Sequence, residues 1–147
     1  MLLNMEVKEG VELPKFSTKG SAGLDFFAPE KIVVPAFGSV VVPLGVKIEL
    51  VDGICIIMKE RSSIATKQKL HLGASVIDSD YRGELHAHFI SANNHDVILP
   101  KGSKIIQGIF LMYSQPQFNL TKVLSNTERG EGAFGSTDNK IKENCKI

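Results

Sequence analysis

The region from Lys31 to Lys59 constrains the fold most strongly, because short β-branched runs alternate there with turn signals. The runs are KIVV, SVVV, GVKIEL and GICIIMK, and they are separated by PAFG, PLG and VDG. Runs of this kind between glycine and proline turns are typical of consecutive antiparallel strands. The only helix candidate, Ser63 to Leu70, is short for a stable helix. The pattern predicts an all-β sandwich or barrel.

Four later runs extend this pattern: ELHAHFIS, DVIL, KIIQGIFLM and FNLTKVL (118–124). In the first of them the apolar residues Leu85, Ala87 and Phe89 alternate with polar residues. Such alternation is expected of a strand with one buried face. Each of the four runs is therefore predicted to form a strand.

Length and charge limit the classes of function. At 147 residues the chain is predicted to be one domain, residues 1–125, with a tail at 126–147. The formal net charge of +1 gives no general attraction to nucleic acid or to an anionic membrane. We find no signal peptide and no apolar run long enough to cross a membrane. We therefore expect an intracellular protein, cytoplasmic or nuclear, with no nucleic-acid or membrane partner.

The tail contains Gly130, Gly132 and Gly135, which have the G-x-G-x-x-G spacing of a dinucleotide-binding turn. That motif needs a preceding strand, a following helix and a second strand, and too few residues follow here. The tail is polar, so we expect it to be mobile until a ligand binds. Arg129 could contact a phosphate and Phe134 could stack on a base. A disordered terminus remains the alternative.

Two polar clusters stand out from the strands. In VIDSDYRGE (76–84), a carboxylate next to strand backbone could act as a general base, although a polar hairpin turn is the alternative. In KERSSIATK (59–67), an arginine and two serines at a helix start could bind an anion, although an ordinary serine N-cap is the alternative. The four histidines, and the two cysteines Cys55 and Cys145, show no recognisable metal-ligand spacing, so we interpret the histidines as structural or surface residues.

Five segments follow one another along the chain: AGLDFFAP (22–29), ERSSIA (60–65), GASVIDSDYRGE (73–84), KGSKIIQGI (101–109) and RGEGAFGSTD (129–138). In this order they resemble the five motifs of the trimeric dUTP pyrophosphatase (dUTPase) family. The resemblance covers nearly the whole chain with matching spacing. It implies a jelly-roll β-barrel that forms a homotrimer with a mobile C-terminal arm. It also implies Mg²⁺-dependent hydrolysis of dUTP to dUMP and pyrophosphate, in active sites built from three chains each.

The resemblance also assigns roles to residues of this sequence. Asp78 would be the general base that orients water for attack on the α-phosphorus, and Asp25 would hold the magnesium through water. The hairpin from Ser75 to His86 would bind the uracil and deoxyribose, and the tail would close as a lid. The residues implied on the phosphates are Arg61, Ser62, Ser63, Gln107, Arg129, Gly135, Ser136 and Thr137. The residues implied on the uracil and deoxyribose are Ser75, Val76, Ile77, Tyr81, His86 and Phe134.

The sequence departs from the family pattern at four positions. Glu60 stands where a proline is usual, Ser63 and Ser75 where glycine is common, and Ser103 where aspartate is usual. Two alternative functions remain open. One is the related dCTP deaminase, whose catalytic glutamate would fall at Arg82 and whose second arginine would fall at Thr66. The other is a trimeric scaffold that has lost catalysis.

Overall fold

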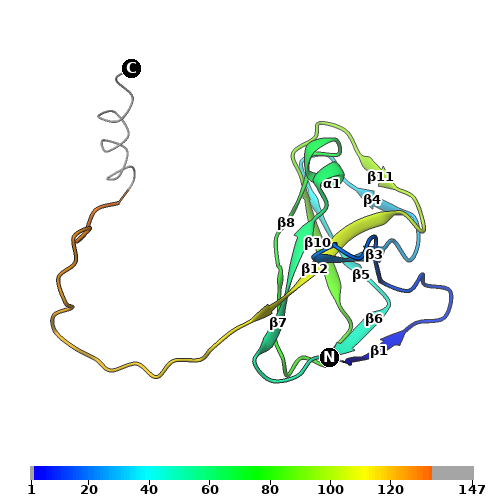
Figure 1. The fold of residues 1–147 in the computed structure, drawn as a ribbon. Helices are drawn as coiled ribbons and strands as arrows, with labels where there is room; N and C mark the ends of the chain where they lie inside the picture. The colour runs from blue at the N-terminus through cyan, green and yellow to red at the C-terminus, as the bar shows by residue number, and fades with distance from the viewer. Residues whose placement is uncertain (1, 134–147) are drawn as a thin grey trace, which may run out of the picture. The chain divides into compact units, whose positions relative to one another are not determined.

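The structure is a computed structural model that describes residues 2–133 (Figure 1). The chain forms two units, a compact one at Met1–Ser114 and another that begins at Gln115. The first unit, which we call the body, contains all the strands and the helix found in the described residues. Within residues 2–133, no helix is long and apolar enough to span a membrane.

The described residues form twelve strands and one short helix, α1 (Ser62–Thr66). The strands are β1 (Asn4–Val7), β2 (Lys15–Phe16), β3 (Gly23–Phe27), β4 (Ile32–Val34), β5 (Ser39–Pro43), β6 (Val46–Glu49), β7 (Ile54–Glu60), β8 (Leu70–Leu72), β9 (Val76–Ile77), β10 (His86–Ser91), β11 (Val97–Leu99) and β12 (Lys104–Met112). Seven of them lie in runs that the sequence predicts, namely β4, β5, β6, β7, β10, β11 and β12. The predicted all-β class is confirmed.

The largest sheet has the strand order β2-β3-β12-β7-β9, and every pair of neighbours in it is antiparallel. Its longest strand, β12, pairs with β3 on one side and with β7 on the other. A second sheet has the order β5-β10-β8, and β1-β6 and β11-β4 form two smaller ones. The central β12 therefore holds together strands that are far apart in the sequence.

One hydrophobic core joins these sheets. Phe26 of β3, Ile56 of β7 and Phe89 of β10 are fully buried in it. The predicted alternation is confirmed, because Leu85, just before β10, and Ala87 and Phe89 within it are buried, while the residues between them are more exposed. Burial of these apolar side chains supplies the main driving force for folding.

The helix is shorter than predicted. It ends at Thr66 rather than at Leu70, because Lys69 has a left-handed backbone (φ 49°) and Leu70 begins β8. A lysine in this conformation turns the chain out of a right-handed helix. The apolar residues that suggested a longer helix belong partly to the next strand.

The strand predicted at 118–124 is not formed in the single chain. No strand is assigned there, and its apolar side chains are exposed, with Leu120 96% exposed. A strand is stabilised by pairing with a neighbour and by burying one face. The sequence shows the alternation but does not show where the partner strand would come from, so the prediction was wrong for one chain.

The hairpin predicted from Ser75 to His86 is also wrong. The strands at its two ends belong to different sheets, because β9 pairs with β7 while β10 pairs with β5 and β8. The segment between them is an irregular turn, residues 78–85. Local turn signals cannot distinguish a hairpin from a crossing between two sheets.

Candidate active site

A row of polar side chains crosses four strands of the largest sheet. Lys15 of β2 pairs with Asp25 of β3, Asp25 pairs with Gln107 of β12, and Gln107 pairs with Lys59 of β7. Residues that are directly opposite on neighbouring strands share a face of the sheet. Since Phe26 next to Asp25 lies in the core, this row lies on the face directed away from the core.

Asp25 is the centre of a charged cluster. Its Oδ1 lies 3.0 Å from Nε of Arg61, and its Oδ2 lies 2.9 Å from Nζ of Lys104. The Ser17 hydroxyl donates a further hydrogen bond to Oδ2 at 2.6 Å. Two cations face one carboxylate, so the cluster has a net positive charge. Such a surface can bind an anion such as phosphate.

Burial raises the pKa of Asp25, but other interactions outweigh it. The hydrogen bonds from Ser17 and Lys104, and the positive charges of Arg61 and Lys104, stabilise the ionised carboxylate. The pKa is therefore lowered from its ordinary value. The carboxylate stays ionised and holds both cations in place at neutral pH.

Gln107 lies beside this cluster because a glycine faces it. Its Nε2 donates to the carbonyl of Glu60 at 3.3 Å. A Cβ added to Gly23 would lie 3.0 Å from both Cβ and Cδ of Gln107, so glycine leaves the space that this side chain occupies. The structure thus brings Gln107 close to the strand that carries Asp25 and to the residue before Arg61.

Ser62 and Ser63 form the first turn of α1. The N-cap residue is Arg61, and no side chain caps the helix. The serine N-cap alternative is therefore wrong. Because α1 has only five residues, its dipole contributes little, and the positive charge at this place comes from side chains.

Sequence reasoning missed four polar residues near this cluster: Ser17, Lys15, Lys59 and Lys104. Lys104 was within a recognised motif, but the register of β12 shifts between Lys104 and Ile106. Such a β-bulge re-aims a side chain and leaves no clear mark in the sequence. The pairing of β2 with β3, which brings in Lys15, also depends on a long-range contact.

Asp78 follows β9 and begins the turn 78–85. Its side chain is exposed, and within residues 2–133 it has no hydrogen bond or ion pair. The next residue, Ser79, is buried, and its carbonyl accepts a hydrogen bond from Arg82 Nη1 at 2.8 Å. The backbone amide of Tyr81 donates to the Asp78 carbonyl at 3.2 Å. An accessible carboxylate on a backbone held in this way can accept a proton from water.

The other residues predicted on the uracil and deoxyribose side lie around this turn. Ser75 accepts a hydrogen bond from the backbone amide of Met58 at 2.7 Å, and Val76 and Ile77 form β9. Tyr81 lies against the backbone of Gly83, where a Cβ would be 2.5 Å from its Cζ atom. His86 is exposed on β10, beyond the turn.

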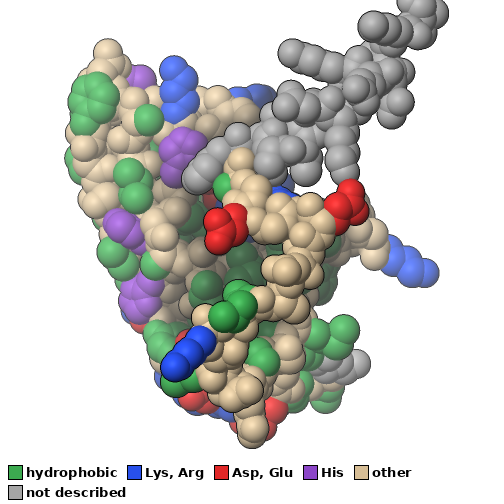
Figure 2. Space-filling view, turned by 90° about the vertical axis from the view of Figure 1, so that its left-hand side faces the viewer, with side chains coloured by type: hydrophobic (Ala, Val, Ile, Leu, Met, Phe, Trp, Pro, Cys, Tyr) green, Lys and Arg blue, Asp and Glu red, His purple; other side chains and the backbone are tan. Residues whose placement is uncertain are grey.

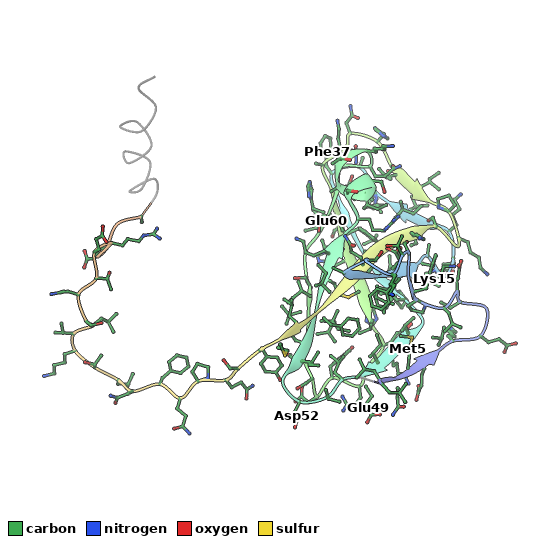
Figure 3. The ribbon with its side chains drawn as sticks, viewed as in Figure 1. Met5, Lys15, Phe37, Glu49, Asp52 and Glu60 are labelled. Atoms are coloured by element: carbon green, nitrogen blue, oxygen red, sulfur yellow. The ribbon has the colours of Figure 1, made fainter. Side chains whose placement is uncertain are left out.

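Asp78 and Arg61 lie toward opposite ends of β7 in one chain. Asp78 follows Ile77, which pairs with Ile56 near the start of β7, whereas Arg61 directly follows its last residue, Glu60. Figure 3 shows Glu60 at one end of β7 and Asp52 at the other. Arg61 lies five positions beyond Ile56 along the strand direction, which corresponds to roughly 17 Å. The two predicted halves of the site are therefore not brought together within the body.

In the segment that begins at Gln115, Arg129 bonds within its own turn. Its Nε donates to the carbonyl of Gly132 at 3.0 Å, and the amide of Gly130 donates to the carbonyl of Thr127 at 3.1 Å. Four predicted site residues, Phe134, Gly135, Ser136 and Thr137, lie outside the described residues.

The histidines do not gather into a metal site. Within residues 2–133 no group of three or more His, Cys, Asp or Glu side chains could hold a metal ion. Figure 2 shows histidine side chains spaced along one side of the molecule. His71, His86 and His95 are exposed and His88 is half-buried, as expected for structural or surface residues.

Comparison with known proteins identifies the family. A model of the dUTPase family matches residues 9–138. The chain belongs to the dUTPase family. It is 38% identical over 136 residues to the deoxyuridine 5'-triphosphate nucleotidohydrolase of Paramecium bursaria Chlorella virus 1, covering 92% of this chain and 96% of that protein. It is 36% identical over 142 residues to the protein of the same name from Hydrogenobaculum sp., covering 95% and 99%.

Solved dUTPase structures share its fold. The Staphylococcus bacteriophage 80alpha dUTPase with dUpNHpp has a TM-score of 0.85 and 21% identity, covering 92% of this chain and 98% of that one. The dUTPase of phage phi11 of S. aureus, whose structure concerns a structural Mg(II) ion, has a TM-score of 0.75 and 18% identity, covering 84% and 98%. At these identities the likeness shows the fold alone.

The contacts of Asp25 limit how it could bind a magnesium ion. An ionised carboxylate accepts about four hydrogen bonds, and Arg61, Lys104 and Ser17 already use three of these positions. A direct metal bond would displace one of the cations. The remaining position would suit a water molecule bound to Mg²⁺. Asp25 thus suits an indirect role only.

Proposed function

We propose that this chain hydrolyses dUTP to dUMP and pyrophosphate, as a homotrimer whose active sites combine residues from different chains. Membership of the dUTPase family supports the reaction. The separation of Asp78 from Arg61 along β7 is the observation that supports the shared site. One bound triphosphate reaches both residues more easily when each comes from a different chain.

Asp78 supplies the base. Its exposed carboxylate orients a water molecule and takes its proton as the water oxygen bonds to the α-phosphorus. The bond from the α-phosphorus to the bridging oxygen breaks, and that oxygen leaves with pyrophosphate. Tyr81, Val76 and Ile77, near the same turn, hold the deoxyribose and uracil, with Ser75 and His86 at its ends.

Arg61 and Gln107, together with Ser62 and Ser63, bind the phosphates. Lys104 joins them, because it shares the Asp25 carboxylate with Arg61. Bound Mg²⁺ would neutralise and clamp the phosphate oxygens, with Asp25 in contact only through water. Asp25 also holds the side chains of Arg61 and Lys104 at a fixed spacing.

The C-terminal residues cover the site of a neighbouring chain. The exposed apolar residues of 118–124 suit a strand that pairs with another protomer, within a jelly-roll body. Beyond them Arg129, Gly135, Ser136 and Thr137 would contact phosphates, and Phe134 would lie over the uracil. Closing this lid excludes water other than the attacking molecule.

A substrate assay separates the three candidate functions. Release of pyrophosphate from dUTP supports the proposal, release of ammonia from dCTP would support a deaminase, and neither product would support a scaffold. Arg82, which occupies the position of the deaminase glutamate, bonds to the carbonyls of Ser79 and Tyr81 in its own turn. This contact disfavours the deaminase.

A mixing experiment tests the shared site. Asp78→Asn chains and Arg61→Ala chains, each nearly inactive, are unfolded, mixed equally and refolded together. In a cyclic trimer, every mixed assembly has one site with both residues intact, so random mixing restores about a quarter of the wild-type activity. No recovery, with mixed trimers demonstrated by native mass spectrometry, would show that each site uses one chain for both residues.

A further inference from the structure

Two hydroxyl groups join the turn that carries Asp78 to the end of β12. The Ser79 and Tyr113 hydroxyl oxygens are 2.7 Å apart, and Ser79 is only 8% exposed. Tyr113 is itself fixed, because its backbone amide donates to the carbonyl of Gly53 at 2.9 Å. The bond thus connects the residue after Asp78 to the residue that follows β12.

Among residues 2–133, this bond is the side-chain contact closest in sequence to Asp78 that reaches beyond the turn. The contacts of Tyr81 and Arg82 with backbone carbonyls remain inside the turn. Farther along the turn, Arg82 Nη2 lies 3.9 Å from Glu49 Oε1 of β6, and the amide of Gly45 donates to Glu84 at 2.6 Å. On the near side, β9 has only two residues paired with β7. The direction of Asp78 therefore depends strongly on Ser79.

We propose that Ser79 and Tyr113 are positioning residues that fix the Asp78 carboxylate toward the attacking water. The inference rests on the proposed function, in which Asp78 is the general base. Neither residue needs to touch the substrate. Loss of the bond leaves β9 and Tyr81 in place, so binding of the nucleotide is preserved while the water is activated less effectively.

The test uses variants that remove single hydroxyl groups. Tyr113→Phe keeps the aromatic ring, and we expect it to lower kcat about tenfold, because a small misplacement of a catalytic group is costly. KM for dUTP should change little. Ser79→Ala should have the same effect, and the double variant should be no worse than either one, since both remove the same bond. Ser79→Thr, which keeps a hydroxyl, should retain more activity than Ser79→Ala.

Two further variants separate positioning from general stability. In the wild-type protein the amide of Ala36 donates a 2.9 Å hydrogen bond to Asp96, outside the candidate site. Asp96→Ala removes this bond and should leave kcat unchanged. In Asp78→Asn protein, adding Tyr113→Phe should not lower the residual rate further, because the carboxylate that the bond positions is gone. Circular dichroism melting checks that each variant is folded.

The outcomes are distinguishable. Wild-type protein without dUTP hydrolysis would overturn the proposed function and this inference together. If the wild-type protein hydrolyses dUTP and the Tyr113→Phe variant has the same kcat, only the inference is overturned. The inference would also be overturned if Tyr113→Phe lowered kcat by the same factor in wild-type and in Asp78→Asn protein. The Tyr113 hydroxyl would then act independently of the Asp78 carboxylate.

Discussion

The close contact between Gly23 and Gln107 makes a sharp test of the phosphate side of the site. Gly23→Ala adds one methyl group on β3 directly against Gln107 on β12. The new Cβ would lie 3.0 Å from Cβ and Cδ of Gln107, and closer still to its Oε1. Carbon atoms pack at about 3.5–4.0 Å, so Gln107 must leave its position.

The size of the effect follows from this displacement. Cβ of Gln107 is fixed to the backbone of β12, so the side chain turns away from Gly23 and its amide moves by about 1 Å or more. A misplacement of about 1 Å can cost on the order of 100-fold in rate. We expect kcat/KM for dUTP to fall about 10- to 100-fold. The fold should persist, because the amide is the flexible end of the side chain.

Pyrophosphate release from dUTP provides the assay, and Gly20→Ala provides the matched control. Gly20 is three residues away in the sequence, and a Cβ there would have no atom within 4 Å. Gly20→Ala should therefore keep wild-type activity. Melting curves of both variants should show that the proteins are folded.

A second substitution can refute the reasoning. In Gln107→Ala protein Oε1 and Cδ of the side chain are absent and only the 3.0 Å contact with Cβ remains, so Gly23→Ala should cost less activity there than in wild-type protein. If Gly23→Ala reduces the activity of wild-type and Gln107→Ala proteins by the same factor, the methyl group acts elsewhere. The assignment of Gln107 to the phosphate path would then lose this support.

Three further predictions concern the fold and the charged cluster. A protein that ends at Ser114 should still melt cooperatively but not hydrolyse dUTP, since the residues of the hydrophobic core lie in the body; a non-cooperative melt would contradict this. Gly108→Ala should destabilise the fold by about 1–3 kcal/mol in urea denaturation, because its Cβ would meet buried Ile56 at 2.8 Å; unchanged stability would show that the core adapts. The folded-state pKa of Asp25 is lowered, so its carboxylate contributes stability at neutral pH that is lost as pH falls below about 4. Asp25→Asn should flatten the pH dependence of the unfolding free energy in that range, and an identical acid profile would contradict the role of the cluster.

Local patterns in the sequence determined most of the strands. A period of two and glycine or proline turns depend only on neighbouring residues, so β5, β7 and β10 were predictable from their own segments. Alternation even specified which residues of β10 are buried. Asp25, Arg61 and Gln107 were predicted as site residues because they lie within motifs of matching order and spacing.

Only the tertiary structure decided which of these residues meet. Pairing of β12 with both β3 and β7 places Gln107 between Asp25 and Lys59, and a register shift brings in Lys104. The pairing of β9 with β7 separates Asp78 from Arg61. These contacts join residues far apart in the chain, and their stability depends on burial and pairing across the whole sheet rather than on local preference. The exposed run at 118–124 shows the limit of local preference. Alternation allows a segment to form a strand, but the strand forms only when a partner strand pairs with it.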